Sequence, residues 1–411
     1  MNTQETPHAF GKEGNFVPEM KQLFARGQVL YRQYRDLGCW LVIAFLCLLY
    51  AMPAQAQQVI KNGAGIANPN TIVESEAGFR FGSVIVAPIP FSSPLIGSGL
   101  TLGAGYLFSL PGSKPSGFGV ANLESSNGST GLGGGASINF GQGKWNVFAL
   151  AAQADVFYDL PVFGDLDLPL NQDGELASFT IRRTARENLS FGVQLSYLDT
   201  DIRIDSDLLS LLPPTLQPDL DITLGKVHFL VEYDSRDNTF YPTQGYLADL
   251  DLSYNKEIDS AFSDRFELAS KSYLKLLASG SAYRELSNSG VVAARGVFCA
   301  AGEDAPFFDT CGLGLVDGVR GFPAFSFLGN YSASLQGEYR GHFNDRFGYV
   351  AFVGGGGTND DIGDVLTDIS VAGGVGLRIR LSKKFALDYA VDYALNDEGD
   401  RYLYLSLGQK F

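Results

Sequence analysis

The sequence predicts an all-β protein, a transmembrane antiparallel β-barrel of sixteen strands. Three observations predict it: a leader with the parts of a secretory signal peptide, segments of about ten residues in which apolar and small or polar residues alternate, and a composition rich in glycine and aromatic residues. The 411 residues include 49 Gly, 30 Phe and 19 Tyr but only 4 Cys and 3 Met. This composition is typical of β structure.

The leader has a basic segment, a short apolar segment and a small-residue ending, which are the parts of a signal peptide. The apolar segment spans residues 39–52 and is followed by Pro-Ala-Gln-Ala at 53–56, so we expect cleavage after Ala56. A retained helical anchor is the alternative, but fourteen apolar residues are fewer than the roughly 20 that span a bilayer. The basic segment lies far from residue 1, which makes Met20 an alternative start. Its basic residues are Lys21, Arg26, Arg32 and Arg35.

The expected domain organisation is a leader at 1–56, a short periplasmic segment at 57–77 and a barrel at 78–411. Removal of the leader leaves 25 basic and 41 acidic residues and a formal charge of −16. A chain with this negative charge lacks the basic surface of a nucleic-acid-binding protein, and we expect no nucleic acid as a partner. The expected surroundings are outer-membrane lipids and lipopolysaccharide.

Sixteen segments of the predicted barrel alternate with a period of two. An even number of strands places both termini on one side, expected to be periplasmic, and connections after odd-numbered strands on the extracellular side. The longer insertions, 199–221, 299–330 and 395–401, obey this rule. The segments are 79–88, 98–109, 117–124, 131–140, 145–157, 175–184, 188–198, 222–234, 245–255, 265–277, 290–298, 331–342, 347–355, 369–381, 385–394 and 402–411.

A soluble β-sandwich or lipocalin-like barrel would also show alternation. It would need neither sixteen strands nor an aromatic residue at the end of the last one. We expect Phe411, with Leu403, Leu405 and Leu407, to face one side of this strand and to act as an insertion signal.

Cys299 and Cys311 are the two cysteines that follow the leader, and they lie twelve positions apart. In an oxidising periplasm such a pair predicts a disulfide that closes a short loop. A reactive or metal-binding pair is the alternative, but no cluster of His and Cys accompanies them.

Two stretches are more specific than alternation: residues 233–246, Tyr-Asp-Ser-Arg-Asp-Asn-Thr-Phe-Tyr-Pro-Thr-Gln-Gly-Tyr, and residues 305–309, Ala-Pro-Phe-Phe-Asp, leading to Gly-Val-Arg-Gly-Phe at 318–322. In the first, Pro fixes φ and Gly can supply positive φ, which predicts a tight periplasmic turn. Its residues of interest are Asp234, Arg236, Asp237, Phe240, Tyr241, Pro242 and Gly245.

On these two stretches the chain resembles the BamA/TamA outer-membrane assembly family over nearly all of residues 78–411. In that family a Tyr-Asp-x-x-Asp…Phe-Pro-Thr-x-Gly turn and a Val-Arg-Gly-Phe/Tyr loop mark a sixteen-stranded barrel. The resemblance implies that the loop with Val319, Arg320, Gly321 and Phe322 folds back into the lumen, where Arg320 would pair with Glu338 of the following strand.

Two departures from the family's pattern bear on function. The family often supplies a second acid from Phe-Val-Asp-x-Gly, whereas residues 352–356 read Phe-Val-Gly-Gly-Gly, and we expect a more weakly held loop. Only about twenty residues separate Ala56 from the first strand, too few for the family's periplasmic POTRA domains. A fused patatin-type hydrolase has no room either, and the expected mature chain contains no Gly-x-Ser-x-Gly elbow.

The resemblance implies a barrel that assists the insertion or translocation of proteins, or lipids, at the outer membrane through an openable seam between its first and last strands. A passive channel or structural surface-exposed barrel is the alternative. Client outer-membrane proteins, or a separate periplasmic protein that supplies the absent domains, are the expected partners.

We expect no enzyme, cofactor or metal. His228 and His342 are the only histidines after the leader, and no nucleophile lies beside either one at a recognisable spacing. The acidic stretch 359–364 lacks the alternating ligands of a calcium loop, so solvated loop tips are the expected role.

Overall fold

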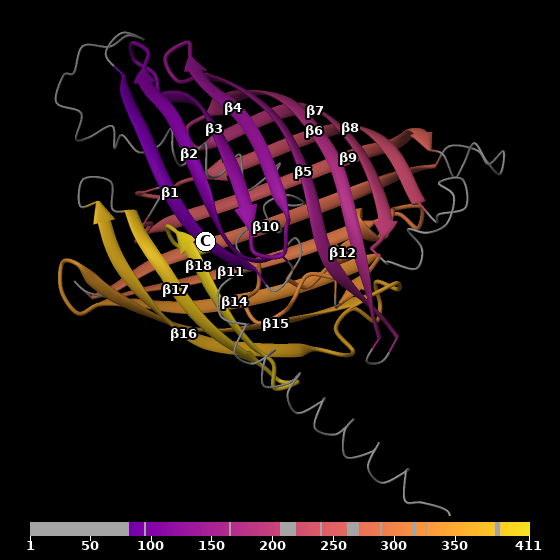
Figure 1. The fold of residues 1–411 in the computed structure, drawn as a ribbon. Coiled ribbons are helices and arrows are strands. Elements are labelled where there is room, and N and C mark those ends of the chain that lie inside the picture. The colour runs from indigo at the N-terminus through magenta and orange to yellow at the C-terminus, as the bar shows by residue number, and fades with distance from the viewer. Residues whose placement is uncertain are drawn as a thin grey trace, which may run out of the picture. The chain divides into compact units, whose positions relative to one another are not determined.

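The main sheet contains sixteen antiparallel strands in chain order, as the sequence predicts (Figure 1). The protein is represented by a computed structural model, which describes residues 82–411 except 94–95, 164–165, 206–218, 239–240, 261–270, 288–289, 315–317, 326 and 383–386. The expected leader at 1–56, the alternative start Met20 and the segment 57–77 lie outside these described residues. Within them, no helix is both long and apolar enough to cross a membrane.

The longest strands are β5 and β6, with 19 and 21 residues, and the last strand of the main sheet, β18, has seven. Two further strands of two residues each, β12 and β13, form a small hairpin in the connection between β11 and β14. The bounds are β1 Ser83–Ser93, β2 Gly97–Ser109, β3 Pro115–Ser125, β4 Thr130–Phe140, β5 Trp145–Phe163, β6 Leu166–Arg186, β7 Leu189–Ile204, β8 Asp219–Asp234, β9 Gly245–Ser260, β10 Ser272–Ser287, β11 Gly290–Ala301, β12 Cys311–Gly312, β13 Leu328–Gly329, β14 Tyr331–His342, β15 Phe347–Asn359, β16 Ser370–Ser382, β17 Leu387–Asn396 and β18 Arg401–Leu407.

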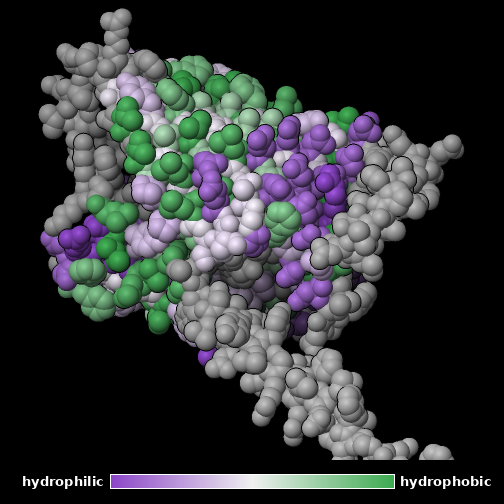
Figure 2. All heavy atoms as spheres, in the orientation of Figure 1, coloured by the Kyte–Doolittle hydropathy of each residue, from purple (hydrophilic) through white to green (hydrophobic). Residues whose placement is uncertain are grey.

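Alternation along the strands separates an apolar outside from a polar inside. On β7, for example, Val193 and Leu195 are exposed, whereas Gln194 and Ser196 are buried. Figure 2 shows hydrophobic side chains gathered over β1–β4, with hydrophilic ones over β5 and its neighbours. Because consecutive strand residues point to opposite faces, one apolar face toward lipid and one polar face toward the lumen follow directly from the period of two.

The first and last strands form a seam. β1 and β18 lie close together (Figure 1), but within the described residues no ladder joins them. Each other neighbouring pair is joined by a ladder; the one between β17 and β18 runs from Tyr389↔Leu407 to Leu395↔Arg401. The barrel is therefore hydrogen-bonded around its wall except at this seam.

Several of the predicted strands were wrong in their bounds, and the tenth and the last show the physical reasons. The tenth was expected at 265–277 but spans Ser272–Ser287, because the alternation continues through the lumen-facing Ser281 and Tyr283. The last was expected to reach residue 411 but ends at Leu407, where Gly408 adopts a φ of +85° and turns the chain away from the strand direction.

Candidate functional site

The connection between β11 and β14, residues 302–330, enters the lumen and carries the most deeply buried arginine of the described chain. Arg320 has no exposed surface. Its Nη1 lies 2.7 Å from Oδ2 of Asp392, its Nη2 pairs with Oε2 of Glu338, and its Nε donates to Oε1 of Gln336 at 2.9 Å. The guanidinium also lies over the ring of Phe352, 3.6 Å from its centroid. The loop is thereby attached to β14, β15 and β17.

The expectation that Arg320 lacks a second carboxylate was wrong. Asp392 of β17 supplies it, 72 positions along the chain from Arg320. At the position where the family's acid was expected, Gly354 faces Gln336, and a Cβ there would lie 2.8 Å from the Cβ of Gln336. The glutamine therefore occupies the space beside Gly354, and its amide oxygen accepts from Arg320 instead of an acid on β15.

Three arginines and two carboxylates form one buried network around Arg320. Glu338 is shared by Arg320 and Arg340, whose Nε lies 2.6 Å from Oε1 of Glu338. Asp392 is shared by Arg320 and Arg378, at 2.7 and 2.5 Å. Burial in a low-dielectric lumen makes an unpaired charge costly, and each of the three guanidinium groups is paired with at least one of the two carboxylates. The burial also fixes the loop, because its withdrawal would take from each carboxylate one of its two arginine partners.

The network continues to the turn between β8 and β9. Arg340 donates from Nη1 to the carbonyl oxygen of Pro242 at 3.4 Å and lies over the ring of Tyr241, 5.9 Å from its centroid. His342 also packs on Tyr241, with ring centroids 5.2 Å apart. Burial raises the pKa of Tyr241 to about 12. The two sequence stretches singled out above thus meet through Glu338 and Arg340.

The turn itself is held by its own polar residues. Asp234 binds Arg236 with two bonds of 2.8 and 3.0 Å, and Asp237 accepts from the backbone nitrogens of Thr243 and Gln244 at 2.9 and 3.1 Å. Gly245 has a φ of +100°, the conformation for which a glycine was expected there. Phe240, the remaining residue singled out in this turn, lies outside the described residues.

Gly321 connects the loop to the seam strand β18. Its backbone nitrogen donates to the hydroxyl of Tyr404 at 2.5 Å. Its φ is +109°, and an added Cβ would collide with the Cβ of Ala372 on β16, so only glycine fits. On either side of the Arg-Gly pair, Val319 and Phe322 are buried against Leu313 and Ala372. The four residues of the Val-Arg-Gly-Phe sequence therefore place one charge, one backbone donor and two apolar side chains.

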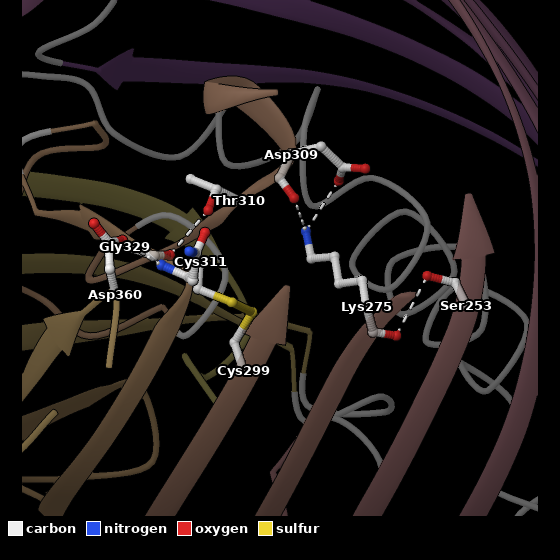
Figure 3. Close-up of a disulfide and its surroundings, with 9 residues drawn as sticks. Ser253, Lys275, Cys299, Asp309, Thr310, Cys311, Gly329 and Asp360 are labelled. Atoms are coloured by element: carbon white, nitrogen blue, oxygen red, sulfur yellow. Dashed lines mark hydrogen bonds and ion pairs between the residues drawn. A yellow bond between two sulfur atoms is a disulfide. The ribbon is translucent and has the colours of Figure 1, made fainter. Parts of the chain in front are cut away.

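A second anchor lies at the start of the same loop. Cys299 of β11 and Cys311 form a disulfide (Figure 3). Beside it, the Asp309 carboxylate pairs with Lys226 of β8 and lies 2.9 Å from Lys275 Nζ of β10. Burial alone would raise the pKa of the Asp309 carboxyl, but the two lysines outweigh it and hold that pKa well below its usual range. This anchor fixes the loop to the β8–β11 side of the wall.

An apolar cluster attaches the loop to the wall on the β1 side. Phe308, Ala324 and Phe325 of the loop are buried together with Phe91 of β1. Phe325 stacks on Tyr158 of β5, with centroids 5.4 Å apart. The remaining buried members are Ile96, Leu123, Val156, Leu170, Ile202 and Leu224. The loop therefore contacts both strands that flank the seam, β1 through this cluster and β18 through Tyr404.

Phe411, expected on the face of a last strand, instead lies in the lumen. It is buried in a cluster with Tyr283 and Ala293, and its carbonyl oxygen accepts from Arg340 Nη2. Gln409 accepts from Arg378 at 3.0 Å. The inward position follows from the turn at Gly408, and the role of Phe411 as an insertion signal stays a prediction.

A sixteen-stranded antiparallel barrel with an apolar outside and an internally anchored loop defines an outer-membrane β-barrel protein. A family description of the Omp85 superfamily domain matches residues 153–411, which is more than half of the chain. The chain therefore belongs to the Omp85 superfamily.

Solved structures show the same fold. BamA from Haemophilus ducreyi lacking POTRA domains 1–3 is 17% identical, with a TM-score of 0.54 over 80% of this chain and 70% of that one. CdiB from Escherichia coli is 14% identical, with a TM-score of 0.52, and the match covers 79% of this chain and 62% of CdiB. This chain thus spans less than two thirds of CdiB. No curated protein sequence matches the chain significantly.

The charge balance of the network makes a testable prediction. Arg320→Met leaves two arginines with two carboxylates, whereas Asp392→Asn leaves three arginines with one. Because breaking a buried ion pair costs about 3–5 kcal/mol, both variants should lower the free energy of unfolding, and Asp392→Asn should lower it more. Urea titration of the purified barrel, read by heat-modifiable gel mobility, measures the effect.

The double variant should be less destabilised than the sum of the single variants, since each removes a partner of the other. Arg284→Met, at an exposed arginine of β10, is the matched control and should change stability by no more than about 0.5 kcal/mol. Unchanged stability and gel mobility in Arg320→Met would contradict the structural role of Arg320.

The disulfide makes a second prediction. Loop-closure entropy for a bridge of this span is worth about 3 kcal/mol, so the variant with Cys299→Ser and Cys311→Ser should unfold at lower urea. Reduction of the wild-type protein should produce the same shift, and reduction of the variant none. Identical unfolding midpoints for the oxidised and reduced wild type would rule out a stabilising bridge.

Proposed function

We propose that this barrel assists the insertion or translocation of proteins, or lipids, at the outer membrane, with the seam between β1 and β18 as the place where a client strand pairs. The observation that carries the proposal is the seam itself: the two strands lie close together, and no ladder joins them within the described residues.

The chemistry of a strand edge in lipid supports this use. Backbone groups without partners cost several kcal/mol in a hydrocarbon layer, so a seam without a ladder is the easiest part of the wall to open. An open edge is also a template onto which another strand can add through main-chain hydrogen bonds. β1 offers eleven residues, Ser83–Ser93, whereas β18 has seven.

The internal loop would control this opening. It contacts β1 through the cluster around Phe91 and Phe325, and β18 through Gly321 and Tyr404. Because the Arg320 network ties the loop more extensively to β14, β15 and β17, we infer that opening moves β1 away while the β14–β18 side keeps its arrangement.

An even number of strands places both ends of the barrel on one side, which we infer to be the periplasm, with the 302–330 loop entering from the outside. Outer-membrane lipids and lipopolysaccharide would surround it. The solved structure of BamA from Haemophilus ducreyi is of a form that lacks POTRA domains 1–3, so such domains belong to that relative. We propose that a separate periplasmic protein delivers clients to this barrel, which co-purification after cross-linking would detect.

A locked seam tests the proposal. Cysteine pairs, one in β1 and one in β18, are scanned along both strands in cells depleted of the wild-type protein. Oxidation of a pair that cross-links should stop the accumulation of folded outer-membrane proteins, and a reductant should restore it. The measurement is the heat-modifiable fraction of newly made barrels.

The matched control is Val391→Cys with Leu405→Cys, which bridges β17 and β18 at residues already opposite each other. This bridge should leave assembly unaffected. Normal assembly in cells with a cross-linked seam contradicts the proposal, and a depletion defect limited to one nutrient or ion would favour the alternative, a passive channel.

A further inference from the structure

A continuous row of hydrogen bonds crosses the lumen face of β6–β9, away from the Arg320 network. Ser196 Oγ of β7 lies 3.4 Å from His228 Nε2 of β8. His228 Nδ1 lies 2.9 and 3.1 Å from the two carboxylate oxygens of Asp251 on β9. Ser196 and His228 are buried, and the Asp251 side chain keeps 28% of its surface exposed. A hydroxyl, an imidazole and a carboxylate thus follow one another in the order of a serine hydrolase.

We propose that Ser196, His228 and Asp251 form a hydrolase site for carboxylic esters that enter the lumen. With its proton on Nδ1 held by Asp251, the His228 ring presents Nε2 as a base toward the hydroxyl of Ser196. Ser196 is the nucleophile, His228 the general base and acid, and Asp251 the positioning residue that fixes the tautomer of the ring.

Gln194 positions the hydroxyl of Ser196. Its Nε2 donates to Ser196 Oγ at 2.9 Å, and its amide oxygen accepts from the hydroxyl of Thr180 at 2.9 Å. The amide therefore has a fixed orientation and holds the hydroxyl of Ser196 beside the His228 ring.

Ser178 provides a second buried hydroxyl beside Ser196. It lies directly opposite Ser196 in the ladder between β6 and β7. Its Oγ is buried and has no hydrogen-bond partner within the described part of the chain. A buried hydroxyl without a partner is costly in a structure, and a carbonyl oxygen of a bound ester would satisfy it.

Apolar side chains lie next to this row on the same face. Phe148 and Leu150 of β5 are buried in a cluster with Leu176 of β6. In the ladder, Phe148 is opposite Thr180 and Leu150 is opposite Ser178. An acyl chain placed along these residues would bring its carbonyl to Ser196, so the substrate class is an ester of an aliphatic acid.

The 302–330 loop limits access to the site. Lys226 is opposite Ser196 in the ladder between β7 and β8, and its Nζ is held by Asp309 of the loop. Release of Asp309 would remove the loop's attachment beside the nucleophile, and we expect it to increase access.

Hydrolysis at this site needs no co-reactant other than water. Ser196 Oγ attacks the ester carbonyl as its proton passes to His228 Nε2; the tetrahedral intermediate then expels the alcohol, which takes that proton. Water, deprotonated by His228, attacks the acyl-serine, and the carboxylic acid leaves as Ser196 regains its proton.

A fluorophosphonate probe with an alkyl chain tests the nucleophile in the purified, folded barrel. Peptide mapping should find the probe on Ser196, and Ser196→Ala should abolish labelling at full heat-modifiable mobility. Asp309→Asn should speed labelling, since the loop's attachment to Lys226 is weakened. Ser281→Ala, at another buried lumen serine, is the matched control and should leave labelling unchanged.

Hydrolysis of p-nitrophenyl butyrate then separates the roles. Gln194→Ala should lower kcat, because the hydroxyl of Ser196 loses the hydrogen bond that positions it beside His228. Asp251→Asn should lower kcat with KM unchanged, because it alters the ring of His228 and not the binding of the ester. If Ser196 stays unlabelled in both the wild type and Asp309→Asn, or if hydrolysis is the same in Ser196→Ala, the row is only a polar lining of the lumen and the proposal is overturned.

Discussion

The arrangement of the lumen depends on the cost of burying the guanidinium of Arg320. A buried charge must be paired, and in this barrel the partners come from strands that are distant in sequence, Glu338 on β14 and Asp392 on β17. Each of these acids also pairs with a second arginine. The loop, the turn between β8 and β9 and the segment after β18 are consequently attached to one set of charges, and the paired burial of Arg320 fixes the loop's position against the wall.

The same network gives the two flanks of the seam different attachments. On the β18 side the loop contributes a hydrogen bond to Tyr404, close to its fixed Arg320. On the β1 side the contact is an apolar cluster, which is non-directional. Together with a seam that lacks a ladder within the described residues, this difference underlies our proposal that the wall opens beside β1 while β14 to β18 keep their arrangement. Omp85 membership and the proposed assembly role are consistent with this physical picture.

The number and order of the strands could be predicted because a period of two, with lipid on one side and a polar lumen on the other, is a local property of the sequence. The pairing of Arg320 with Glu338 could also be predicted, because Glu338 lies on the strand that follows the loop. The pairing with Asp392 could not be predicted, because it depends on how the wall closes and on Gln336 filling the space beside Gly354. The grouping of Ser196, His228 and Asp251 likewise depends on the register of three strands, which no spacing in the chain reveals.

We propose that Arg320 holds the loop as part of the wall and that the loop transmits its state to β18. Hydrogen exchange of the barrel in lipid nanodiscs tests it most directly, with peptides covering 318–325, β18 and, for comparison, β6 and β7. We expect 318–325 to exchange as slowly as the strands, and Arg320→Met to speed exchange in this segment and in β18 but not in β6 and β7. Rapid exchange of 318–325 in the wild type, or a variant in which β18 is unaffected, would contradict it.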